Sequence, residues 1–285
     1  MSTTPLDGAT FGPDTTVASD EDLTQTSEGF QATAEVSLLQ DYFDQFDALV
    51  DEMRLHITED GLWASAVDPA NVAMIVEDLD ESAFDRYMAS GGMIGFNLGR
   101  VIDILSMGDK GELATLELDL ETRKLHIQIE ELSYTLALID PESIRKEPDI
   151  PQMDLPVTAV VEASDFDRGL TAADMVDNHL TLRTGTTDDG VDALYLEAEG
   201  DTDDVDLELT VDEDLVAFED DGEGGNSLFS LDYLKDINKV IPGDVEITIE
   251  LGSEFPVKLH YDHNEVDGDA KSGVTVMLAP RISKE

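Results

Sequence analysis

Cysteine is absent from the 285 residues of this chain, so disulfide bonds and thiolate chemistry are excluded. The chain also has no uninterrupted apolar run of 18 residues, which argues against a membrane-spanning helix. Its first 29 residues contain neither the basic nor the apolar segment of a secretory signal. We therefore expect a soluble cytoplasmic protein without a membrane partner.

Basic residues are scarce, because 16 Lys and Arg stand against 66 Asp and Glu and leave a net charge of −50. Such a charge favours solubility and self-repulsion, and it argues against a protein that binds DNA by charge alone. The Debye length shrinks to about 3 Å in molar salt, where the repulsion is tolerable. The composition thus predicts an organism with a concentrated-salt cytoplasm, and a hydrophobic fraction of 41% allows a substantial core.

Residues 1–29 form a distinct segment with six acidic residues, no basic one, and many Gly, Pro, Ser and Thr. This composition is typical of a disordered arm. A binding role for Leu6 or Phe11 is the alternative.

From Phe30 onward the chain alternates between strand and helix patterns. "SLLQDYFDQFDALVDE" places apolar residues at helical spacing, with Ser37 as the expected N-cap. Four helices are predicted, at about 37–50, 98–106, 164–176 and 231–239. Alternation predicts strands at 30–36, 53–58, 61–68, 72–79, 113–120, 124–130, 133–140, 179–184, 193–201, 245–252 and 274–279.

The second half repeats the first. "LFSLDYLKDINKVI" matches "IGFNLGRVIDILSM" about 133 positions earlier, and each is followed by an alternating strand. Each repeat is expected to read one helix, three strands, one helix and three strands. Between the repeats, Pro141, Pro148, Pro151 and Pro156 forbid a continuous helix or strand. We expect domains at 30–139 and 157–285, joined by an extended linker at 140–156.

No catalytic site, metal site or cofactor is predicted. The five histidines fall mostly inside strands, and the two in "HYDH" point to opposite faces of a strand. So many carboxylates make any glycosidase-like pair uninformative. "DTDDVDLELTVDED" lacks the glycine of a calcium loop, and "DGEGGNS" lacks the lysine of a phosphate loop.

Several segments together resemble proliferating cell nuclear antigen, the DNA sliding clamp of archaea and eukaryotes. They are "AVDPANV", "LIDPES", "SLDYLKDINK" and "VMLAPRI", and the similarity extends over residues 30–285. The resemblance implies an α+β fold of two tandem clamp domains, each with two helices packed on antiparallel sheet. It also implies a homotrimeric closed ring around duplex DNA, and the acidic composition suggests a haloarchaeal member.

The resemblance places the four helices along the hole of the ring. Their charges sum to −3, 0, −2 and 0, so the predicted pore is acidic, whereas other clamps present Lys and Arg there. The candidate phosphate contacts are Arg100, Arg168, Lys235 and Lys239. The alternative is that these are surface charges paired with nearby carboxylates.

The resemblance also implies a pocket in which partners insert a glutamine, an aliphatic residue and two aromatics. Met277 could adapt to different partners because its side chain is flexible. On the residues alone, ordinary core packing is the alternative. The matching positions are Val67, Val72, Met74, Ile150, Pro256, Met277, Ala279 and Pro280.

The same resemblance predicts that "LSYTLAL" of one subunit pairs with "DVDLELT" of the next across each joint. Val205, Leu207 and Leu209 would form an apolar face toward Tyr134 or Leu136. The alternative is that both segments are internal strands.

The resemblance therefore implies a non-catalytic DNA polymerase sliding clamp. Its expected partners are double-stranded DNA, DNA polymerase, the clamp loader (replication factor C), flap endonuclease and DNA ligase. The alternative is a monomeric acidic protein that mimics nucleic acid.

Overall fold

The computed structural model describes residues 29–146, 153–266 and 269–281. The first repeat comprises β1 (Gln31–Glu35), α1 (Val36–Asp47), β2 (Glu52–Ile57), β3 (Gly61–Val67), β4 (Ala73–Asp80), β5 (Arg86–Met88), β6 (Gly92–Asn97), α2 (Leu98–Leu105), β7 (Leu113–Asp119), β8 (Lys124–Ile129) and β9 (Leu132–Ala137). The second repeat comprises β10 (Val157–Glu162), α3 (Ala163–Ala173), β11 (His179–Thr186), β12 (Asp192–Glu199), β13 (Asp204–Thr210), β14 (Ala217–Asp220), β15 (Asn226–Ser230), α4 (Leu231–Asn238), β16 (Glu246–Leu251), β17 (Val257–Val266) and β18 (Asp269–Leu278). Both repeats therefore follow one order of elements.

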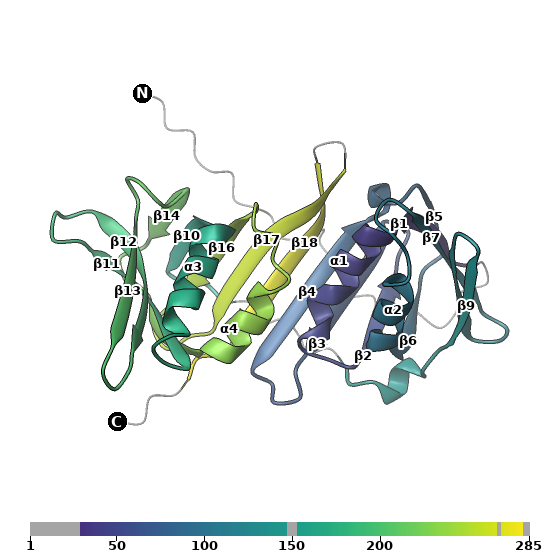
Figure 1. Ribbon diagram of the computed structural model, residues 1–285, viewed down its shortest axis with the longest axis horizontal. Helices are drawn as coiled ribbons and strands as arrows, with labels where there is room; N and C mark the ends of the chain where they lie inside the picture. Colours follow the sequence, from purple (N-terminus) through teal and green to yellow (C-terminus); the bar gives the residue numbers. More distant parts are fainter. Residues whose placement is uncertain (1–28, 147–152, 267–268, 282–285) are drawn as a thin grey trace.

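The strands form three antiparallel sheets. A nine-stranded sheet has the order β14-β10-β16-β17-β18-β4-β3-β2-β6, so it runs through both repeats. The repeats join where β18 pairs with β4, with Val276 opposite Ile75. A five-stranded sheet, β5-β1-β7-β8-β9, and a four-stranded sheet, β13-β12-β11-β15, lie at the two ends of the molecule (Figure 1).

All four helices lie on one face of the nine-stranded sheet (Figure 1). Each helix buries an apolar stripe; that of α1 includes Tyr42, Phe43 and Phe46, all at most 1% exposed. The opposite face of the helices is left toward solvent, so one broad helical surface results. Within the described residues, no helix has the length and apolar character needed to span a membrane.

The predicted order of elements was wrong in one respect, because five strands, not three, separate the two helices of each repeat. The missed strands β5, β6, β14 and β15 are short or contain glycine and charge, which weakens the alternating pattern. The prediction of Ser37 as N-cap was also wrong. Helix α1 begins at Val36 after Glu35, and the Ser37 hydroxyl instead donates to the Glu35 carboxylate at 3.4 Å.

The first part of the predicted linker is held against the first repeat. Pro141–Ser143 forms a 3₁₀ turn, and the Arg54 Nε donates to the Pro141 carbonyl at 2.9 Å. Ile144 is buried beneath this turn. The linker is therefore not extended at its start. Its centre, with Ile150, and the predicted arm apart from Gly29 lie outside the described residues.

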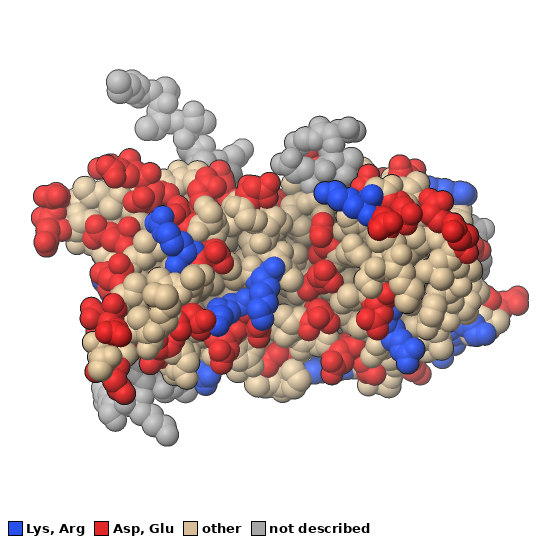
Figure 2. Space-filling model, in the orientation of Figure 1, with Lys and Arg blue, Asp and Glu red and all other residues tan. Residues whose placement is uncertain are grey.

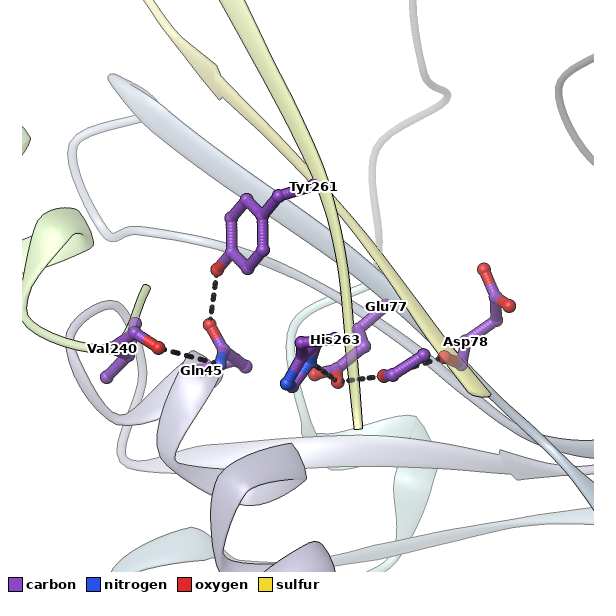
Figure 3. A network of polar contacts seen from close by, with 7 residues as sticks. Gln45, Glu77, Asp78, Val240, Tyr261 and His263 are labelled. Carbon is purple, nitrogen blue, oxygen red and sulfur yellow. Dashed lines mark hydrogen bonds and ion pairs between the residues drawn. The ribbon is translucent and has the colours of Figure 1, made fainter. Parts of the chain in front are cut away.

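A buried polar network stabilises the joint between the repeats (Figure 3). Gln45 of α1 donates to the Val240 carbonyl at 3.2 Å and accepts from the Tyr261 hydroxyl at 2.6 Å. Beside it, Glu77 Oε1 lies 2.9 Å from His263 Nε2 and 2.5 Å from Ser272 Oγ. These bonds connect α1 and β4 of the first repeat to β17 and β18 of the second.

Burial favours the neutral forms of both Glu77 and His263. Burial raises the pKa of Glu77 well above its ordinary value and lowers the pKa of His263 to about 4. The Ser272 hydroxyl donates to Glu77 Oε1 and also lies 3.0 Å from the Asp78 carbonyl, its alternative acceptor. Neutral forms of Glu77 and His263 avoid the cost of burying an ion pair, although Glu77 Oε2 is buried without a hydrogen-bond partner among the described residues.

Candidate functional site

A row of mostly apolar side chains crosses the joint on the sheet face opposite the helices. Val67 of β3 pairs with Met74 of β4, which pairs with Met277 of β18. Met74 is 7% exposed and Met277 is 8% exposed. The row ends at Lys258, which is paired with Glu250 at 2.7 Å. Three residues predicted for the partner pocket are therefore adjacent on neighbouring strands.

The strand ends place three more of the predicted residues beside this row. The Ala279 amide donates to the Val72 carbonyl at 2.8 Å, which continues the ladder one step beyond β18. Pro256 immediately precedes Val257, the residue opposite Leu278, so it lies next to Ala279. Ala279 and Pro280 are half-buried. A small residue and a rigid one thus end the strand beside the two buried methionines.

The loop between β3 and β4 is fixed by a residue that the sequence did not single out. Asp68 is 4% exposed and accepts from the amides of Ala70, Val72 and Ala73 at 2.6–2.9 Å. It also accepts from the Tyr233 hydroxyl of α4 at 2.8 Å. Burial opposes the charge, but these hydrogen bonds outweigh it and hold the pKa of Asp68 below its usual range. The Asp-Pro-Ala-Asn spacing of "VDPANV" is the sequence signal for such a turn.

The linker reaches the same loop. Arg145 Nη1 donates to the Asp68 carbonyl at 3.0 Å, and its other terminal nitrogen contacts the Asn71 side chain. At the opposite side, the Arg281 amide donates to the Leu228 carbonyl at 2.7 Å. The site therefore has walls from both repeats and from the start of the linker. Its remaining predicted member, Ile150, lies outside the described residues.

Three of the four predicted pore cations are paired within the chain. Arg168 lies 3.1 Å from Asp165, Lys235 lies 2.6 Å from Asp174, and Lys239 lies 2.5 Å from Asp236. Arg100 is exposed and has no ion-pair partner among the described residues. Arg168 and Lys239 also remain largely exposed, so these pairs are solvated.

The helical face as a whole is acidic. Figure 2 shows red side chains spread more widely than blue ones across it, with blue groups over α3 and α4. Partial burial, together with Asp47 and Asp41, raises the pKa of Asp44 on α1. Carboxylates are therefore crowded on the helical face (Figure 2), in agreement with the net negative charge that the sequence gives the four helices.

The two strands predicted to form the subunit contact are both sheet edges. Within the described residues, β9 pairs only with β8, and β13 pairs only with β12. The alternative that they are internal strands is wrong. Leu136 and Leu209 are buried in their own repeats, whereas Tyr134, Val205 and Leu207 are partly exposed at the edges.

No group of three His, Cys, Asp or Glu residues suited to a metal ion occurs in the described part of the chain. The histidines make local hydrogen bonds instead: His179 to Asp177, His126 to Thr135 and His260 to Thr275. Each of these pairs the ring with a neighbouring side chain on a strand or strand end.

Comparison with known proteins gives consistent results. The family model for the N-terminal domain of proliferating cell nuclear antigen matches residues 30–141. A DNA polymerase sliding clamp of Halobacterium salinarum is 54% identical over 89% of this chain and 98% of that protein. The one from Haloarcula marismortui is 52% identical over 90% of this chain and 100% of that protein.

Solved structures show the same fold. The A. fulgidus PCNA bound to the C-terminal region of FEN-1 superimposes with a TM-score of 0.81, at 34% identity, over 90% of this chain and 100% of that one. PCNA of Thermococcus kodakaraensis gives 0.77 at 25% identity over 88% of this chain and 100% of that one. The chain therefore belongs to the DNA polymerase sliding clamp family, and the predicted fold class and resemblance are confirmed.

Proposed function

We propose that three copies of this chain close into a ring around duplex DNA and act as a processivity factor, not as an enzyme. The observation that carries this proposal is that β9 and β13 lie at opposite ends of the molecule (Figure 1) and, within the described residues, each pairs with a neighbour on one side only. Edges that are exposed at opposite ends allow head-to-tail association, which closes into a ring when the rotation per subunit fits.

The internal repeat predicts how these edges meet. The pairs Leu259–Val276 and Ile127–Tyr134 occupy equivalent places in the two repeats. The pairs Ala66–Ile75 and Ala198–Val205 are equivalent in the same way. Strands β18 and β4 already pair inside the chain, and their counterparts are β9 and β13.

Transfer of the internal register places specific residues opposite each other. Ile75 pairs with Val276 inside the chain, so Val205 falls opposite Tyr134 of the next subunit. By the same step, Leu207 falls opposite Leu132. Both pairs lie on the core side of the sheet, where they extend the buried layer across the joint. Leu136 and Leu209 support this layer from within their own subunits.

A ring of this kind presents the four helices of each subunit toward the hole. Arg100, Arg168, Lys235 and Lys239 are the proposed phosphate contacts. Counterion release yields little affinity in molar salt, so an acidic pore loses little there. A closed ring stays on DNA because of its topology.

The proposed docking site for partners is the row of apolar side chains, Val67, Met74 and Met277, on the sheet face opposite the helices. A DNA polymerase, the clamp loader, flap endonuclease and DNA ligase would each insert a glutamine-aliphatic-diaromatic motif over Met74 and Met277. Val67, Val72, Pro256, Ala279 and Pro280 would line the walls, with Ile150 from the linker. Such a clamp works on the nucleoid in a high-salt cytoplasm.

Light scattering after size exclusion in molar salt tests the assembly, because a clamp elutes with three times the chain mass. A processivity assay with a cognate polymerase on primed circular DNA tests the activity. A protein that stays monomeric and does not lengthen the products would instead support the acidic mimic of nucleic acid.

A further inference from the structure

An acidic groove lies on the outer face of the four-stranded sheet. It has a volume of about 720 Å³ and is formed by β11, β12, β13 and the turn 200–203. Seven carboxylates line it: Asp177, Glu197, Glu199, Asp201, Asp203, Asp204 and Asp206. Burial and the neighbouring Glu197 raise the pKa of Asp206, which reflects the crowding of negative charge.

This groove is the repeat counterpart of the proposed partner pocket. Val67 pairs with Met74, and the equivalent pair in the second repeat is Glu199 with Asp204. An apolar site at the joint within the chain thus corresponds to an acidic site at the free edge. Whatever covers the acidic site must differ in chemistry from an aromatic motif.

The other half of the groove would come from the next copy of the chain. Met277 pairs with Met74 at the internal joint, and the corresponding pairing brings Thr135 of β9 opposite Asp204. On β9, Ala137 lies on the same face as Thr135, two positions further along, and it pairs with Lys124 of β8. Lys124 is exposed and has no ion pair within the described residues. The edge strand β9 therefore carries the Thr135 hydroxyl, and the neighbouring strand β8 carries a cation without an ion pair in the described part of the chain.

We propose that Thr135 and Lys124 of one subunit and Asp204 of the next form a polar latch that closes the outer side of each subunit joint. The latch depends on the ring proposed above, and it specifies the side-chain contacts that keep that ring closed. The Thr135 hydroxyl lies 3.0 Å from His126 Nδ1; when that nitrogen carries the proton, the hydroxyl accepts from it and donates to the Asp204 carboxylate.

Lys124 reaches the same carboxylate over the small side chain of Ala137. Neighbouring strands are about 4.8 Å apart, so an extended lysine at Lys124 spans the row between them. In the proposed joint the Ala137 amide would donate to the Thr202 carbonyl of the next subunit, by analogy with the bond from Ala279 to Val72 inside the chain. At the subunit joint, charged and polar side chains thus occupy the positions that Met74 and Met277 occupy at the internal joint.

The latch also explains why motif docking would occur at one kind of joint. A ring of three subunits has three internal joints and three subunit joints with the same backbone geometry. Aromatic side chains would have to bury against Asp204 and Glu199 at the subunit joints, and uncompensated desolvation of carboxylates opposes that. Isothermal titration with a motif peptide is therefore expected to give one site per subunit.

The test measures the monomer–trimer equilibrium by sedimentation velocity at about 0.5 M and about 3 M KCl, since screening weakens ion pairs at the higher concentration. Lys124→Gln is expected to weaken each joint about threefold, or the trimer about thirtyfold over three joints, at the lower salt only. Lys124→Glu and Asp204→Lys should each weaken it further, and the double variant should recover most of the loss. Lys110→Glu, an exposed lysine away from both edges, is the matched control.

Unchanged assembly of Lys124→Gln and Lys124→Glu at both salt concentrations would overturn the latch, as would a double variant as weak as the sum of the single ones. Equal melting temperatures of the monomers establish that folding is intact. A wild type that never forms trimers would instead refute the ring itself, so the two failures are distinguishable.

Discussion

Ala279→Asp separates a docking site from ordinary core. Ala279 is half-buried, and the hydrogen bond from its amide to the Val72 carbonyl, at 2.8 Å, involves only backbone atoms. A new carboxylate there stays hydrated in the free ring, so the free energy of unfolding should change by less than about 1 kcal/mol. In the complex, aromatic side chains over Met277 would desolvate the unpaired charge at a cost of about 3–5 kcal/mol. Affinity should fall more than a hundredfold.

The assay is fluorescence anisotropy in molar salt with a peptide that carries the glutamine-aliphatic-diaromatic motif. Ala279→Ser controls for size and polarity, and Ser253→Asp places the same charge on an exposed turn nearby. Both controls should bind normally. Wild-type binding by Ala279→Asp would place the docking site elsewhere, and an unfolded variant would show that this strand end is core.

Three further outcomes are expected. Dilution to roughly 0.1 M salt, where the Debye length is about 10 Å, should weaken the ring or lower its melting temperature because of the net charge of −50; an unchanged trimer and melting temperature would contradict this. Neutralising Arg100, Arg168, Lys235 and Lys239 together should reduce clamp-stimulated synthesis without changing the trimer mass, and full activity would show that topology suffices. Burial raises the pKa of Glu77 above its ordinary 4.5, so the folded state binds more protons than the unfolded state, and the protein loses stability as the pH rises above 4.5. The pKa of His263 is lowered from 6.5 to about 4, so this residue makes the protein more stable as the pH rises to 6.5. Glu77→Gln removes the first effect alone, so in urea titrations its stability relative to wild type should rise by up to about 1.4 kcal/mol per pH unit above pH 4.5, whereas parallel curves would refute the neutral assignment.

The sequence by itself determined the class of fold and most of its elements. Apolar residues at helical spacing located α1 to α4 to within three residues at each end, because a stripe that packs on a sheet must recur every three or four positions. The repeat of about 133 residues predicted two similar halves. The acidic composition and the lack of cysteine were equally readable, since they depend on no contact between distant residues.

Local pattern was insufficient wherever a strand depends on its neighbours. Strands β5 and β14 are only three and four residues long, and their pairing with β1 and β10 defines them. The start of α1 was misplaced because Glu35 and Ser37 are both polar, and only the backbone path decides which one precedes the helix.

Only the tertiary structure decided the environment of individual polar groups. Glu77 is one of 66 acidic residues, yet pairing of β4 with β18 buries it beside His263, 186 positions away in sequence. Asp68 similarly becomes the anchor of the pocket loop through Tyr233 of the other repeat. That β9 and β13 end their sheets also follows only from the way the strands pair with one another. Burial and strand pairing are sums over residues far apart in the chain, and no local pattern encodes them.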